Sequence, residues 1–115
     1  MRSLIIMMAL VFFVAPSFAA KGIVETQITR LMADSELFGR CMAKVSSSPH
    51  LNSDISDCKS DWVTFDCSGD FASKDVANRS YASAQLALVT EKVVVLTVNN
   101  SRKHNGYCWA ERINF

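Results

Sequence analysis

Four cysteines most constrain how this short chain can fold. The chain has 115 residues, and its cysteines are Cys41, Cys58, Cys67 and Cys108. An even number of cysteines in a short exported chain indicates two disulfides, because so small a core is marginal and each bridge adds about 2–4 kcal/mol. A metal site is disfavoured, since there is no C-x-x-C pattern and the two histidines stand apart in the sequence. We therefore predict two disulfides, with no metal and no cofactor.

The N-terminal segment indicates that the chain is exported. Arg2 precedes an apolar run from Leu4 to Val14, which has the length of a signal-peptide core and is too short to span a membrane. Pro16 ends the run, and small residues follow at the positions required for cleavage after Ala19. We predict a signal peptide at residues 1–19 and a single domain at 20–115 that is secreted or periplasmic and has no membrane span. An uncleaved membrane anchor is the alternative.

The charge balance argues against nucleic acid as a partner. The chain has 12 Lys and Arg against 11 Asp and Glu, and removal of the signal peptide takes away Arg2. The mature domain then has no formal net charge, whereas binding to phosphates needs a cationic excess or a cationic face.

The hydrophobic pattern predicts a mainly β domain with one helix. Alternating and β-branched segments predict strands at residues 23–32, 38–45, 62–67, 93–98 and 107–115. Ser73 is a candidate N-cap for a helix that runs to about Lys92. The order strand, strand, strand, helix, strand, strand is that of a small five-stranded OB-like barrel. A plain antiparallel sheet with one helix packed on it is the rival fold.

Two segments stand out within this order. The polar stretch at residues 46–61 predicts a long surface loop, with Cys58 as its tether. Residues 93–98, "VVVLTV", form the most hydrophobic strand, which is typical of a central position.

The last hairpin is the candidate binding site. Asn105 and Gly106 predict a tight turn, which places Arg102, Lys103 and His104 at an exposed tip able to hold a carboxylate or phosphate. The alternative is a solvated turn with no ligand.

Aromatic residues near this turn suggest a sugar ligand instead. Tyr107 and Trp109 could stack on a pyranose while Asn105 and Arg112 bind its hydroxyl groups, although Trp109 and Trp62 could equally be core or interface residues. Strict alternation places five residues of the last strand on one face, which would bind a partner if the helix leaves it uncovered: Tyr107, Trp109, Glu111, Ile113 and Phe115.

No pattern indicates catalysis. Four bridged cysteines leave no thiol nucleophile, and neither a G-x-S-x-G nor an H-E-x-x-H motif is present. Asp54, Asp57 and Asp61 share one loop but lack the glycine and glutamate of a calcium-binding loop. We predict a chain that binds and does not catalyse; a small hydrolase or enzyme inhibitor is the least favoured alternative.

The spacing of these elements resembles a family of bacterial toxin subunits. The segments "FGRCMAKV" and "ISDCKSDWVTFDC", followed by "YASAQLALVTEKVVVLTVNN", are similar in layout to the OB-fold B subunits of pertussis-like and subtilase-like AB toxins. The resemblance implies an exported, glycan-binding homo-oligomer. It also favours the pairing Cys41–Cys58, which leaves Cys67–Cys108; the set Cys41–Cys67 with Cys58–Cys108 is also geometrically feasible.

We therefore expect an exported recognition module for a glycan or an envelope protein. The alternative is a periplasmic structural or assembly protein whose aromatic face is an oligomer interface.

Overall fold

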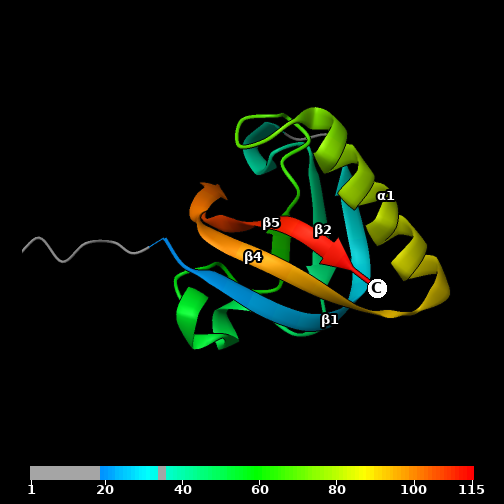
Figure 1. Ribbon diagram of the computed structural model, residues 1–115, viewed down its shortest axis with the longest axis horizontal. Coiled ribbons are helices and arrows are strands. Elements are labelled where there is room, and N and C mark those ends of the chain that lie inside the picture. Colours follow the sequence, from blue (N-terminus) through cyan, green and yellow to red (C-terminus); the bar gives the residue numbers. More distant parts are fainter. Residues whose placement is uncertain (1–18, 34–35) are drawn as a thin grey trace, which may run out of the picture.

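The protein folds as a closed five-stranded barrel with one helix (Figure 1). The computed structural model describes residues 19–33 and 36–115, so the predicted signal peptide lies, up to residue 18, outside the described residues. Around the barrel the strands follow the order β1-β2-β3-β5-β4. The elements are β1 (Lys21–Ala33), β2 (Cys41–Val45), β3 (Trp62–Thr64), α1 (Lys74–Thr90), β4 (Val93–His104) and β5 (Tyr107–Asn114).

Strand β1 is long enough to pair with two neighbours. Its first half pairs antiparallel with β4, and its second half pairs antiparallel with β2. The register shifts between Ile28 and Arg30, where the strand has changed partner. Val24, Thr26 and Ile28 are buried while the residues between them are exposed, which confirms the alternation predicted for this segment.

The barrel closes along a narrow seam between β3 and β5. Strand β3 has three residues, and its parallel pairing with β5 is registered through Thr64 and Trp109. This closure gives the OB-fold strand order, so the predicted barrel is confirmed and the plain sheet is excluded. The third strand is shorter than the predicted 62–67; Asp66 has a positive φ of 64°, which is incompatible with continued pairing.

One disulfide attaches to the chain before β3 and the other attaches after it. Cys41 is bonded to Cys67, and Cys58 is bonded to Cys108. All four cysteines are therefore bridged as predicted, but the favoured pairing Cys41–Cys58 with Cys67–Cys108 is wrong. Because β2 and β3 are antiparallel, the chain leaving β3 passes the start of β2, where Cys41 lies. Cys58 lies before β3, at the opposite end of that pair.

Helix α1 packs on the barrel through small residues. The Ser73 hydroxyl accepts a hydrogen bond from the Val76 amide, which confirms the predicted N-cap. Ala77, Ala84 and Ala87 are buried against the core. The helix ends at Thr90, two residues before the predicted end, because Glu91 adopts the left-handed conformation.

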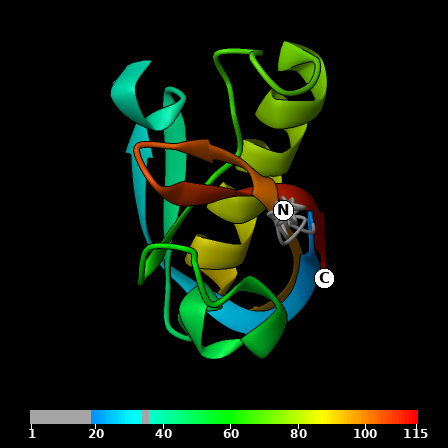
Figure 2. The same cartoon turned by 90° about the vertical axis from the view of Figure 1, so that its left-hand side faces the viewer.

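Strand β4 runs further than the pattern predicted. It continues past residue 98 to His104, and only Asn105 and Gly106, both with positive φ, form the turn. The second half of β4 is polar and therefore does not show the hydrophobic pattern of a strand. Its pairing register with β5 shifts between Asn99 and Lys103. In Figure 2 the β4–β5 hairpin projects toward the viewer, in front of α1.

The predicted single aromatic face of β5 is also wrong. Trp109 pairs with Asn99, but a register shift opposite Thr97 and Val98 changes the alternation along the strand. Ile113 consequently lies opposite the buried Leu96 and packs against the core.

Candidate functional site

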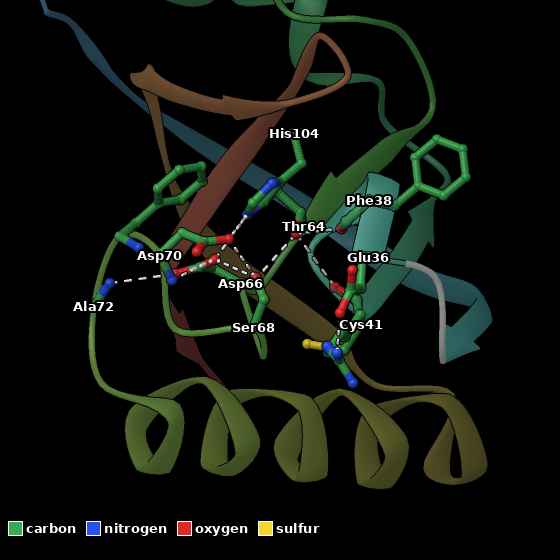
Figure 3. Close-up of polar contacts among 11 residues, drawn as sticks. Glu36, Phe38, Cys41, Thr64, Asp66, Ser68, Asp70, Ala72 and His104 are labelled. Carbon is green, nitrogen blue, oxygen red and sulfur yellow. Dashed lines mark hydrogen bonds and ion pairs between the residues drawn. The ribbon is translucent and has the colours of Figure 1, made fainter.

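The candidate site lies where the β3–β5 seam meets the tip of the β4–β5 hairpin. Three segments meet there: the hairpin, the loop between β3 and α1, and the connection between β1 and β2 (Figure 3). We call their contacting residues the seam cluster: Phe38, Asp66, Phe71, His104, Tyr107 and Trp109.

Asp66 anchors the loop between β3 and α1. Its carboxylate is fully buried and accepts hydrogen bonds from the amides of Asp70 (3.2 Å), Phe71 (2.6 Å) and Ala72 (3.2 Å), and from the Ser68 hydroxyl (3.0 Å). The chain therefore wraps around one side chain before α1 begins.

His104 completes this network from the hairpin. Its Nε2 lies 2.7 Å from Asp66 Oδ1 and 3.7 Å from Asp70 Oδ2. Because the carboxylate can only accept, the Nε2–H group of His104 donates the hydrogen bond to Asp66 Oδ1. Burial raises the pKa of Asp66, but the bonds from His104, the Phe71 and Ala72 amides and Ser68 outweigh it and hold that pKa below its ordinary value.

The imidazole of His104 is held between two neighbours. The Phe71 ring stacks on it, with centroids 4.3 Å apart and planes 21° from parallel. On another side lies Gly39, where an added Cβ would stand 2.5 Å from His104 Cδ2. Only 12% of the His104 side chain is exposed. The predicted exposed placement of His104 is therefore wrong, because this half-buried residue links three segments.

Thr64 links two of these segments through hydrogen bonds. Its hydroxyl donates to the Phe38 carbonyl (2.8 Å) and accepts from the Asp66 amide (3.1 Å). A single buried side chain of β3 thus fixes both the β1–β2 connection and the start of the Asp66 loop.

The aromatic residues flank this polar centre. The Phe38 and Tyr107 rings meet edge to face at 5.8 Å, and Trp109 meets Phe71 edge to face at 5.9 Å. Lys59 Nζ lies 5.2 Å from the centre of the Tyr107 ring. Tyr107, Trp109 and Phe38 are each partly exposed.

The other predicted site residues differ in their surroundings. Arg102 and Asn105 are exposed, as expected for binding residues. Lys103 forms a 2.6 Å ion pair with Asp57 and helps to hold the hairpin in place. Arg112 is exposed on the outside of β5, beside Thr97 of β4.

Sequence reasoning missed Asp66, Phe38, Phe71 and Lys59. The alternation at residues 62–67 placed Asp66 inside the third strand, whereas it lies in the loop after β3, and its contact with His104 is non-local. No local pattern could have revealed that Asp66 binds the hairpin.

Asp66, Asp70 and His104 could in principle bind a metal ion, since one ligand atom of each lies within 4.8 Å of the others. The Asp66 carboxylate, however, already accepts five hydrogen bonds, which fill its lone pairs. A cation would have to displace His104. The geometry therefore favours a His–Asp pair that stabilises the fold.

The His–Asp pair also lacks a nucleophile. Within the described residues His104 hydrogen-bonds to Asp66, and no hydroxyl is bonded to its ring. All four cysteines are in disulfides. Among the described residues, the His–Asp pair therefore has no hydroxyl or thiol placed as the nucleophile of a catalytic triad.

Away from the seam cluster, a hollow lies between β1 and the end of α1. It has a volume of about 420 Å³ and is lined by Gln27, Ile28, Thr29, Leu88 and Glu91. One charged group and no aromatic ring face it, so it offers less for recognition than the seam cluster.

Comparison with known proteins adds no assignment: no family model, curated protein or solved structure matches this chain. Among the described residues, no helix has the length and apolar character needed to cross a membrane. Two disulfides fit an oxidising compartment such as the extracellular space or the periplasm.

Proposed function

We propose that this chain is an exported, non-catalytic binding module that recognises a glycan at the tip of the β4–β5 hairpin. The binding surface, here called the tip surface, consists of Phe38, Lys59, Arg102, Asn105 and Tyr107. The observation that carries the proposal is the contact between Phe38 and Tyr107. It joins the β1–β2 connection to the β4–β5 turn, the two loops with which OB-fold barrels bind oligosaccharides and oligonucleotides.

The chemistry of the tip surface suits a sugar better than a nucleic acid. Partly exposed aromatic rings offer an apolar surface to the carbon face of a pyranose, and Arg102 and Asn105 supply exposed hydrogen-bonding groups. The chain as a whole lacks the cationic excess that oligonucleotide binding requires. The resemblance to toxin B subunits points to the same class of ligand.

The tip is also rigid before any ligand binds. Disulfide Cys58–Cys108 holds the hairpin two residues from its turn, and the Lys59 amide donates to the Gly106 carbonyl at 3.0 Å. The Lys103–Asp57 pair holds one strand from the side. A preorganised surface loses little conformational entropy on binding, so few contacts suffice for measurable affinity.

The test is a glycan array followed by calorimetry with the strongest binder. We expect Tyr107→Ala and Arg102→Ala each to weaken binding by roughly tenfold or more without unfolding the protein. Phe115→Ala is the matched control, because Phe115 is an exposed aromatic residue outside the tip surface. If folded wild-type protein binds no glycan, or if Phe115→Ala weakens binding as much as Tyr107→Ala, the proposal is wrong.

A further inference from the structure

Strand β4 has the composition of a strand buried on both faces, but only its inner face is covered by described residues. Val94, Leu96 and Val98 point into the core and are fully buried. Val95 and Thr97, which point outward, are half-buried, and Val93 is 50% exposed. An unbroken apolar run is typical of a strand with something packed on each side, whereas a solvated outer face normally alternates with polar residues.

Strand β1 extends this outer face with one apolar residue. On β1, Ile23 lies opposite Thr97 and is 61% exposed. Figure 1 shows β4 and β5 on the near side of the barrel, with no helix in front of the drawn strands. We call these three apolar residues and the threonine beside them the outer patch: Ile23, Val93, Val95 and Thr97.

Charged residues of opposite sign lie on the two sides of the outer patch. Glu25 on β1 pairs in register with Val95, and Arg112 on β5 pairs in register with Thr97. Both are exposed, and neither forms an ion pair with any described residue. At the rim, Lys21 and Glu111 already neutralise each other at 2.7 Å.

We propose that the outer patch is the interface of a homodimer, in which the β1–β4–β5 faces of two copies pack against each other. A two-fold axis lying in the interface, perpendicular to the line from Glu25 to Arg112, sets the Glu25 of each copy against the Arg112 of the other. The apolar residues then form the dry centre and the charged pairs the rim, as in specific protein interfaces. The face has no net charge, so a second copy suits it better than an anionic or cationic partner.

The patch is small, which sets the expected affinity. Same-face residues repeat about every 7 Å along a strand and strands lie about 4.8 Å apart, so the outer patch and its two charged neighbours cover roughly 200 Å² per copy, which is below the range of stable interfaces. We therefore expect a weak, transient dimer that is populated only at high protein concentration.

Sedimentation velocity over a concentration series of the mature protein tests this proposal. Val95→Lys should raise the dimer dissociation constant at least tenfold with little change in the melting temperature. Ile23→Lys serves as a second variant, because Ile23 is already exposed and its substitution leaves the core intact. Val89→Lys is the control: Val89 is 81% exposed on α1, outside the outer patch, and its substitution should leave the dimer unchanged.

Charge reversal then tests the geometry. Glu25→Arg and Arg112→Glu should each weaken the dimer, and the double variant should restore it. A wild-type protein that stays monomeric at every concentration, or an oligomer that tolerates both lysine substitutions, would overturn the proposal. Capture of a different protein by a monomeric chain would overturn it equally. Glycan binding by the tip surface should persist in Val95→Lys, so the two proposals fail separately.

Discussion

The two sides of this barrel are stabilised by different kinds of interaction. On the β1–β4–β5 side, long antiparallel strands pair along most of their length and bury Val94, Leu96 and Val98. On the β3 side, a strand of three residues is secured by two disulfides and by the hydrogen bonds of Asp66. A short strand can close a barrel if covalent and side-chain links replace the backbone ladder that it lacks.

The largest effect should come from the disulfides. Replacing Cys58 and Cys108 by serine should lower the free energy of unfolding by about 4 kcal/mol, because this bond closes a loop with a sequence separation of 50. Loss of Cys41–Cys67, with a separation of 26, should cost about 3.5 kcal/mol. Urea unfolding of both double variants checks the order. Equal stability of the wild type and either variant would show that the seam does not need its cross-links.

The next largest effect tests the other side. Leu96→Ala removes a fully buried side chain from β4 and should cost roughly 3 kcal/mol. Hydrogen exchange should then speed up along the β1–β4–β5 strands. Leu86→Ala on the exposed surface of α1 is the control and should change stability by less than about 0.5 kcal/mol. Similar losses in both variants would mean that β4 is not the core of this side.

Asp66→Asn should be somewhat less damaging. The amide cannot accept all five hydrogen bonds and directs N–H groups at backbone donors, so we expect a loss of roughly 2–3 kcal/mol. Asp70→Asn should have little effect, since the Asp70 side chain is mostly exposed. The comparison is made by thermal unfolding at neutral pH, and equal losses would contradict the central role of Asp66.

Asp66 should also make the stability of the protein depend on pH in acid. The pKa of Asp66 lies below its ordinary value, so its contribution to stability is complete above the unfolded-state pKa of about 4. That contribution is lost as the pH falls through the lower pKa of the folded state. Asp66→Asn should therefore flatten the decline in melting temperature below pH 4, and an unchanged decline would assign it to other carboxylates.

The smallest effect is expected at high pH. Burial raises the pKa of Tyr81, whose ring meets the Phe65 ring at the edge of the core. Its contribution is complete below the unfolded-state pKa of about 10 and is lost as the pH rises through the higher pKa of the folded state. Tyr81→Phe should leave neutral stability within about 0.5 kcal/mol while reducing the alkaline loss of stability. A variant that melts in alkali like the wild type would contradict this.

The features that local chemistry determines were readable in the sequence. The alternation of Val24, Thr26 and Ile28, the Ser73 cap and the Asn105–Gly106 turn all depend on neighbouring residues. These features suffice for the element order, but that order also fits a plain antiparallel sheet, which only the pairing of β3 with β5 excludes.

The features that were missed depend on how distant segments meet. The disulfide pairing follows from the β2–β3 register, and the inward turn of Ile113 follows from a bulge opposite β4. The burial of His104 depends on Asp66, which is 38 residues away along the chain. Residue type alone could not distinguish a ligand-binding histidine from one that holds the fold together.

Gly39 carries two constraints at one position. Its φ of +76° disfavours any other residue, and its missing side chain leaves the space that the imidazole of His104 occupies. Relief of either constraint alone is not enough: a smaller residue at 104 would open the space but leave the backbone angle. In a saturation library selected for secretion, codon 39 should therefore strongly favour glycine, and free variation of position 104 should admit mainly residues that tolerate a positive φ, such as asparagine.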